Sequence, residues 1–393
     1  MDSNARLTTR VLGAWPEVSR LADKWDDMLA ASRADSVYLS WAWISTWQEA
    51  FGRFTRPLFV VAEDESGRLL GAAPLYHTSM RLAGLAPYRA LRVCGDYRSG
   101  AEYPDWPARA ERDEEIVRAL AAALVKAGGW DCLWMPRVSG WSGARDRLVA
   151  GCRAAGLRVH ERKKPFSAFE LPASFDAYLA SLSGNARSMV KRRRKKSVES
   201  GAAFEALTLA ADRGPYVEAL FALNDQRWTE TGLAGSFRRK PAEAQFFRLF
   251  SEAALSRGWL RMYAARVQGA FVAIQAGYVY GRVYHQFQEG FDPQAEAGLG
   301  NALRAYAIEQ LIAEGAREYD FLGGFTEHKR RWLAQERVGH DLFIGRRSAK
   351  NALLFTRPIW PSGRYIRERH PLEAYEARLK NSDPSLAGGR RGQ

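Results

Sequence analysis

Two ionisable side chains on one short segment are the first candidates for chemistry in this chain. The run HQFQE alternates like a strand, so we expect His285, Phe287 and Glu289 to share one face and the two glutamines the other. A histidine or a carboxylate placed there can take a proton from an attacking amine or hydroxyl, directly or through a water molecule. The alternatives are a hydrogen-bonded histidine packed between aromatic rings and, for Glu289, a solvated acid at a strand end.

A glycine turn follows this strand and leads into a helix. Gly298, Leu299 and Gly300 precede apolar residues that recur at helical spacing up to Ile312. Such a turn presents unpaired backbone N–H groups and the positive end of the helix dipole, which suits a pyrophosphate. We predict that these three residues and Asn301 bind the phosphates of a cofactor. The alternative is a turn in which glycine only relieves backbone strain.

A second strand carries a carboxylate between two aromatic residues. Asp320 lies between Tyr319 and Phe321 in a strand that we expect to be buried, where an unpaired carboxylate is unfavourable. Asp320 therefore either pairs with a nearby cation or orients an acceptor substrate. We count His285, Glu289 and Asp320 as candidate catalytic residues.

The whole segment resembles the C-terminal half of the GNAT-type acyltransferase domain of the BioF2-like or CelD-like acetyltransferases, which are related to the Fem peptidyltransferases. The matching parts are the glycine turn with its long helix, YDFLGG from Tyr319 and HKRRW from His328. Upstream, FDAYLASLS from Phe175 and SWAW from Ser40 also look like the family. The arginine or glutamine that opens a typical GNAT pyrophosphate loop would fall at Ala295, which is a departure.

The resemblance implies roles for further residues. In Fem-like relatives a lysine in the motif matching HKRRW lies at the active site, so Lys329 becomes a candidate catalytic residue. The alternative is that Lys329 is an ordinary surface lysine. The helix that ends near residue 231 looks like the acceptor-side helix of the family. The alternative is that its residues only pack in the core or lie on the surface. The predicted substrate-binding residues are Asn224, Arg227, Trp228 and Trp332.

The elements that must position these residues occur in the same order twice. Each half has helices, a hairpin, and then a strand, a helix and a strand. The expected helices and hairpin strands are 16–32, 41–51, 58–63 and 70–75 in the first half, and 216–231, 242–257, 260–266 and 271–280 in the second.

This order predicts an α/β fold of mixed, mainly antiparallel sheets flanked by helices. The resemblance implies two tandem GNAT-like (acyl-CoA N-acyltransferase) domains. We expect an N-terminal domain at 1–172, a catalytic BioF2-like domain at 173–345, and a basic C-terminal extension at 346–393 whose end is disordered.

The net charge of +14 is concentrated in two places. Arg187 and the run KRRRKK from Lys191 give seven cations without an acid, and the extension has eleven Lys/Arg against four Asp/Glu. The rest of the chain holds 40 residues of each sign. The basic helix is either a solvated face or a surface that attracts phosphate from coenzyme A, a nucleotide-linked acceptor or tRNA. The extension either docks on the protein or touches an anionic membrane surface.

The sequence does not indicate a disulfide framework, a metal site, a signal peptide or a membrane span. Cys94, Cys132 and Cys152 are odd in number and widely spaced, which predicts buried thiols and neither disulfides nor a zinc site. We expect no metal. The sequence shows no signal peptide and no apolar run long enough to span a membrane, so we expect a cytoplasmic protein.

These observations predict an acyltransferase. It would move an acyl group, acetyl in the simplest case, from acyl-CoA (acetyl-CoA) to an amine or hydroxyl of a small-molecule, sugar, glycan or polysaccharide-precursor acceptor. One alternative is a Fem-like transferase that uses aminoacyl-tRNA. The other is a GNAT-fold binding protein without turnover.

Overall fold

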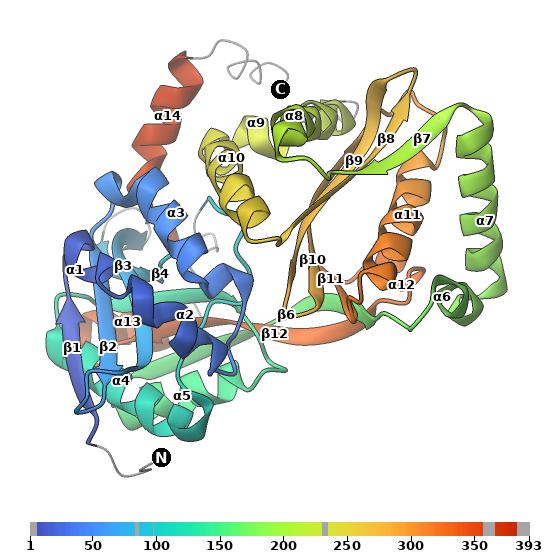
Figure 1. Ribbon diagram of the computed structural model, residues 1–393. Coiled ribbons are helices and arrows are strands. Elements are labelled where there is room, and N and C mark those ends of the chain that lie inside the picture. The colour runs from blue at the N-terminus through green and yellow to red at the C-terminus, as the bar shows by residue number, and fades with distance from the viewer. Residues whose placement is uncertain (1–5, 83–85, 97, 230–234, 357–365, 383–393) are drawn as a thin grey trace. The chain divides into compact units, whose positions relative to one another are not determined.

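The computed structural model describes residues 6–82, 86–96, 98–229, 235–356 and 366–382 (Figure 1). The chain divides into two compact units: unit 1 holds residues 1–164 and 338–375, and unit 2 holds 165–337 and 376–393. The chain enters unit 2 within strand β6 (Arg158–Glu170) and leaves it within strand β12 (Gln335–Gly345). In sequence, most of unit 2 is therefore inserted between two parts of unit 1.

Unit 1 has a mainly antiparallel sheet of order β1-β2-β3-β4-β5-β12, in which β4 and β5 are parallel and β13 pairs with β3. Helices α4 and α5 supply Ile116, Leu120 and Leu148 to its core. The strands are β1 (Thr8–Leu12), β2 (Pro57–Glu63), β3 (Leu69–Leu82), β4 (Ala86–Val93), β5 (Cys132–Val138) and β13 (Ile366–Arg369). The helices are α1 (Trp15–Ser19), α2 (Ala22–Ala30), α3 (Trp41–Phe51), α4 (Asp113–Ala127), α5 (Ala144–Ala154), α13 (Ala349–Thr356) and α14 (Leu372–Ser382), the last of which extends into unit 2.

Unit 2 has a sheet of order β6-β11-β10-β9-β8-β7, antiparallel except for the pair β10 and β11. In Figure 1, α7 and α11 lie on one side of this sheet, and α8 and α10 on the other. Its strands are β7 (Ala202–Ala206), β8 (Leu260–Val267), β9 (Ala270–Tyr280), β10 (Val283–Phe291) and β11 (Glu318–Gly323). Its helices are α6 (Phe175–Ser181), α7 (Gly184–Glu199), α8 (Arg213–Thr229), α9 (Ser236–Arg239), α10 (Pro241–Ser256), α11 (Leu299–Ala313) and α12 (Glu327–Arg330).

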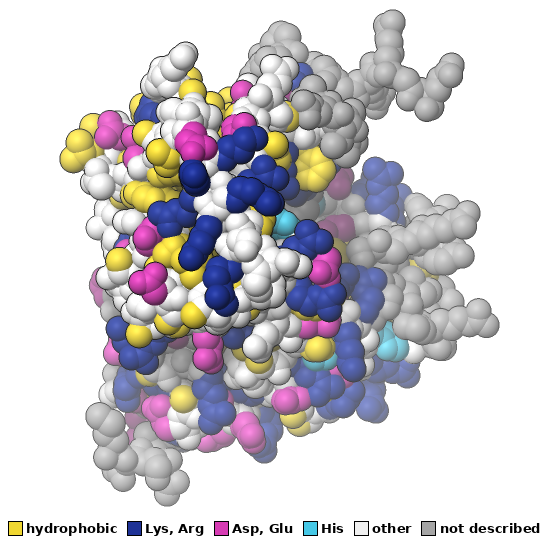
Figure 2. All heavy atoms as spheres, turned by 90° about the vertical axis from the view of Figure 1, so that its right-hand side faces the viewer, with side chains coloured by type: hydrophobic (Ala, Val, Ile, Leu, Met, Phe, Trp, Pro, Cys, Tyr) yellow, Lys and Arg dark blue, Asp and Glu magenta, His cyan; other side chains and the backbone are white. Residues whose placement is uncertain are grey.

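The basic helix α7 begins at a polar cap and buries a narrow stripe. The Ser183 hydroxyl accepts a hydrogen bond from the Ala186 N–H, and Ala186 and Val190 are buried in the core of unit 2. Its cations lie outside this stripe, and Figure 2 shows Lys and Arg side chains gathered on the side of the molecule that carries α7. The exposed ones are Lys191, Arg192, Lys195 and Lys196.

The predicted fold class is confirmed, but several strands were not predicted. Residues 158–170 form one strand, β6, where the sequence predicts extended structure only at 157–160 and 167–171. The pairings of β12 with β5 and of β13 with β3 join segments far apart in the sequence, so local periodicity does not reveal them.

Part of the C-terminal extension packs on unit 1. Leu354 and Phe355 of α13 are buried, and Phe355 stacks on Phe343 with ring centroids 5.3 Å apart. For this helix the docking alternative is confirmed. Residues 357–365 of the extension lie outside the described residues. The same is true of 383–393, which hold most of the predicted disordered tail, and of the last two residues of the helix predicted at 216–231.

The three cysteines are buried free thiols, as predicted. Across the described ranges, no three or more His, Cys, Asp or Glu side chains are grouped so that they could hold a metal ion. Within the same ranges, every helix is too short or too polar to cross a membrane.

Candidate active site

Strands β10 and β11 separate soon after they pair. Val283–His285 lie in parallel register with Glu318–Asp320, and the pairing ends there. Against β9, the register of β10 shifts between Gln286 and Gln288, and against β6 the register of β11 shifts after Asp320. The two irregularities bend the strands at the same level, so the ends of β10 and β11 frame an opening in the sheet of unit 2.

The register shift in β10 corrects one prediction. His285, Phe287 and Glu289 do not share one face, because the bulge breaks the alternation. The Gln286 amide donates to the Glu289 carboxylate at 3.0 Å, so these two side chains lie together. Phe287 stacks on Phe247 of α10, with ring centroids 5.4 Å apart, on the other side of the sheet.

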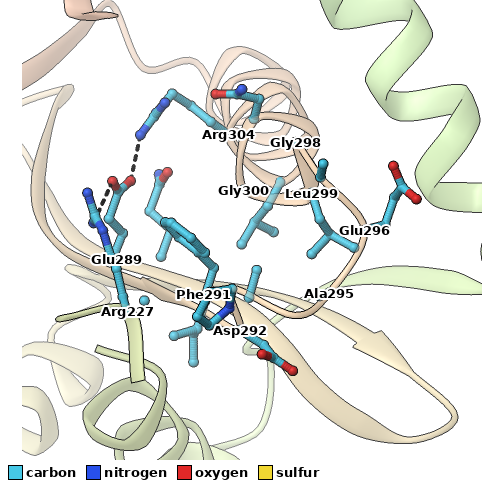
Figure 3. A pocket seen from close by; sticks show the side chains of 18 of the residues that line it. Arg227, Glu289, Phe291, Asp292, Ala295, Glu296, Gly298, Leu299, Gly300 and Arg304 are labelled. Carbon is cyan, nitrogen blue, oxygen red and sulfur yellow. Dashed lines mark hydrogen bonds and ion pairs between the residues drawn. The ribbon is translucent and has the colours of Figure 1, made fainter. Parts of the chain in front are cut away.

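Glu289 lies at the centre of a charged cluster. Its carboxylate accepts hydrogen bonds from Arg304 of α11 at 2.5 Å and from Arg227 of α8 at 3.0 Å, and Figure 3 shows the two guanidinium groups approaching it. Burial acts to raise the pKa of Glu289, but the charges of Arg304 and Arg227 outweigh it and hold that pKa below its usual range. Glu289 is therefore ionised at neutral pH and a weak proton acceptor.

His328 extends the cluster at the start of α12. The Nη1 atom of Arg304 lies 2.8 Å from His328 Nε2, which makes that nitrogen the acceptor. Burial and the charge of Arg304 lower the pKa of His328, so the imidazole is neutral at pH 7. Arg304 is 4% exposed and also lies over the Trp332 ring, 5.3 Å from its centroid.

A cavity of about 340 Å³ runs from this cluster to the start of α11. Gly298, which caps the helix, has a φ of 93°, a conformation that favours glycine. The side chain of Arg193 from α7 packs on Gly298, and its guanidinium donates to the Ala297 carbonyl. The predicted residues that line the cavity are Arg227, Glu289, Gly298, Leu299, Gly300 and Asn301.

The other predicted catalytic residues lie elsewhere among the described residues of unit 2. His285 and Asp320 are buried, with 3.5 Å between Nδ1 and Oδ2. Their neighbours Tyr284 and Tyr319 face the core beside α11, so His285 and Asp320 point to the opposite side of the sheet. The second oxygen of Asp320 accepts a hydrogen bond at 2.7 Å from the backbone N–H of Leu322, which has a φ of 60°.

Lys329 holds the turn after β11. Its ammonium group donates to the carbonyl oxygens of Phe321, Gly323 and Gly324 at 3.0, 2.7 and 2.9 Å. These carbonyls follow Asp320, so Asp320 and Lys329 together fix an unusual backbone path at the edge of the opening. The prediction that Lys329 is catalytic stays a prediction.

The remaining predicted substrate residues support the cluster from outside the cavity wall. Asn224 is buried, donates to the Glu289 carbonyl at 3.1 Å and accepts from Ser236. Trp228 is flanked by the Arg227 and Arg239 guanidinium groups, 5.9 and 5.7 Å from its ring. Trp332 lies in the core under Arg304.

Sequence reasoning missed Arg304 and His328. The position of Arg304 on the apolar stripe of its helix could have revealed its role. A buried arginine at such a position must find partners. His328 stands in the HKRRW motif, whose resemblance to the family points to the neighbouring Lys329 instead.

Residues 184–330, which include the whole cavity wall, match the family model of the acetyltransferase (GNAT) domain. This part of the chain is a GNAT domain. This match agrees with the predicted resemblance, and the matched family is one of acyltransferases. A search of curated proteins found no match.

Solved structures share the fold of most of the chain. The crystal structure of FemX is 11% identical, with a TM-score of 0.61 over 86% of this chain and 98% of that one. The C-terminal domain (DUF2156) of an Agrobacterium fabrum protein described as a lysylphosphatidylglycerol synthetase is 12% identical, with a TM-score of 0.51 over 95% and 99%. At such identities the likeness shows the fold alone.

Proposed function

We propose that the GNAT domain transfers an acyl group from acyl-CoA to an amine or hydroxyl of a sugar, glycan or polysaccharide precursor. The observation that carries this proposal is the cavity at the start of α11. Its wall includes Gly298 and Gly300, and the first turn of the helix contains no acidic residue. Backbone N–H groups and the helix dipole there suit the phosphates of coenzyme A.

The opening between β10 and β11 would place the two substrates on opposite sides of the sheet. The donor would occupy the cavity beside α11, and the acceptor would approach from the side of His285 and Asp320. His285 is then the candidate base that takes the acceptor's proton, with Asp320 orienting its Nδ1. The acceptor atom attacks the thioester carbonyl, the C–S bond breaks, and the CoA thiolate leaves. Glu289 would act as a positioning residue that fixes Arg304.

We place this reaction in the cytoplasm. Three free, buried cysteines suit a reducing compartment, which is also where CoA thioesters are made.

Isothermal titration with acetyl-CoA tests the proposal. Gly300→Val would put a branched side chain at the cavity wall, where a Cβ meets only Phe291 at 3.7 Å. We expect binding to weaken at least tenfold with little change in melting temperature. The matched control is Gly184→Val at the start of α7, where a Cβ meets nothing within 4 Å. Wild-type protein that binds no acyl-CoA would contradict the proposal.

A second candidate, an aminoacyl-tRNA-dependent transferase, is favoured by the exposed cations of α7 (Figure 2). Charged tRNA would then bind with an affinity that falls steeply between 50 and 200 mM salt, by about tenfold or more. Binding of acyl-CoA without transfer to any acceptor would instead indicate a binding protein.

A further inference from the structure

We propose that the inner end of the cavity binds an anionic group and that the preferred acyl chain ends in a carboxylate. This inference rests on the proposed acyl-CoA donor and refines the nature of the acyl group. Its basis is an uneven set of charges around the Glu289 carboxylate.

The cluster has one more cation than anion. Arg304 and Arg227 share the single carboxylate of Glu289, and the lowered pKa of His328 leaves that imidazole neutral. The other acids of the cavity wall, Asp292 and Glu296, lie away from Arg304 in Figure 3. A charge excess at a largely buried site is unfavourable unless a counter-charge arrives.

Both guanidinium groups have capacity for another acceptor. Arg304 is fixed by Glu289 and His328, yet its buried Nε has no hydrogen-bond partner within the part of the chain that the structure describes. Arg227 makes one hydrogen bond to Glu289 through Nη1, and its side chain is 34% exposed. Arginine recognises carboxylates through paired N–H groups, so Arg227 can hold a second carboxylate while it stays near the first.

Glu289 is in turn unsuited to a cationic ligand. Its carboxylate already accepts from Arg304, Arg227 and Gln286. The α-ammonium group of an aminoacyl donor would meet two guanidinium groups at this end of the cavity. The electrostatics therefore favour an anionic acyl chain over a neutral one and disfavour an aminoacyl group.

The position of the cluster suits the acyl end of a donor. Arg304 lies on the same helix as the glycine turn, six residues beyond Gly298 and thus about 9 Å along the axis. The turn and the arginine line one cavity. With the phosphates at the turn, the donor would extend inward toward Arg304 and Arg227.

Two matched pairs of ligands test the inference by isothermal titration. Malonyl-CoA is compared with propionyl-CoA, and succinyl-CoA with butyryl-CoA, because each pair differs by a carboxylate against a methyl group. We expect the carboxylate-ended member of at least one pair to bind about tenfold or more tightly. Arg227→Gln should abolish that preference. Arg248→Gln, which changes an exposed arginine of α10 paired with Glu218, should retain it.

The possible failures separate the two proposals. Equal affinity within both pairs, or a preference that persists in Arg227→Gln, would overturn the inference and leave the acyl-CoA proposal intact. If the wild-type protein binds none of the four thioesters, the proposed function fails as well.

Discussion

The two units contain the same strand, helix and parallel strand, but the helices begin differently. The first turn of α4 in unit 1 holds Asp113, Glu114 and Glu115, and that of α11 in unit 2 holds no acidic residue and follows Gly298. Acidic side chains satisfy the positive end of a helix dipole and repel a phosphate. Of these two helices, α11 alone begins in a way that suits an anionic ligand.

The charged clusters of the two units also differ in whether they lie beside a cavity. In unit 1, Arg92 lies between Asp96 and Glu368 at 2.7 and 2.6 Å, and Tyr76 links Asp96 to His370. This cluster is buried and joins β13 to the sheet. In unit 2, two arginines share one carboxylate beside a cavity. A buried cluster that links a strand to its sheet indicates an anchor, whereas one whose arginines line a cavity indicates a binding site.

The largest expected effect comes from breaking the anchor of unit 1. Arg92→Met would leave two buried carboxylates without their cation, so we expect the free energy of unfolding to fall by about 3–5 kcal/mol in urea titrations. The exposed Arg89→Met is the control and should cost less than about 1 kcal/mol. An equal, small cost for both variants would mean that the cluster is no anchor.

The turn after β11 should be the next most sensitive site. Lys329→Met removes three charge-assisted hydrogen bonds from a turn that contains a left-handed Leu322, and we expect a loss of about 2–3 kcal/mol. Arg331→Met, at a 65% exposed side chain two residues on, should change stability by less than about 0.5 kcal/mol. Lost transfer with unchanged stability would instead support the predicted catalytic role of Lys329.

The clusters should also differ in their response to acid. Burial and the charge of Arg92 lower the pKa of His370 to about 2, so below pH 6.5 the unfolded chain gains a proton that the folded chain does not. Stability contributed by neutral His370 is therefore lost as pH falls, by about 2 kcal/mol between pH 6.5 and 5. His370→Gln should remove that part of the loss in unfolding titrations.

Glu289 would respond in a lower pH range, because its pKa is held below the usual value. Its stabilising effect is present above about pH 4.5 and is lost as pH falls further. Glu289→Gln should leave the pH 6.5 to 5 range unchanged, and a change there would argue against the separation of the two clusters.

The smallest effects concern the glycines of α11. Gly298→Ala should cost about 1–2 kcal/mol, because φ is 93° and a Cβ would lie 2.4 Å from the Arg193 side chain. Gly300→Ala has room and should stabilise the helix by about 0.5–1 kcal/mol. Thermal unfolding of both variants checks this difference, and equal shifts would contradict the distinct roles given to the two glycines.

Strong local patterns made much of unit 2 predictable. The periodicity of α10 and α11, the hairpin of β8 and β9, and the glycine turn all depend on residues near one another in sequence. The bulge in β10 was not predictable, because strand alternation carries no sign of an extra residue. It places Gly290 where a Cβ would lie 2.5 Å from the Asn224 backbone nitrogen, a contact set by α8.

The candidate site was only partly predictable, because some of its features are local in sequence and others are not. The glycine turn and Glu289 follow from local spacing, whereas the partners of Glu289 come from α8 and α11 and meet only in the folded domain. Lys329 stands in a recognisable motif, yet its hydrogen bonds to three carbonyl oxygens depend on the path of the turn after β11.

The division of unit 1 into two stretches of chain has a consequence for synthesis on the ribosome. Its sheet needs β12 and β13, and its charged cluster needs Glu368 and His370, all of which are translated after most of unit 2. Unit 1, whose first stretch is translated first, is thus completed only after the stretch 165–337 of unit 2. Until then its strand β5 and the Arg92 side chain lack their final partners, whereas the stretch 165–337 is complete as soon as it has emerged.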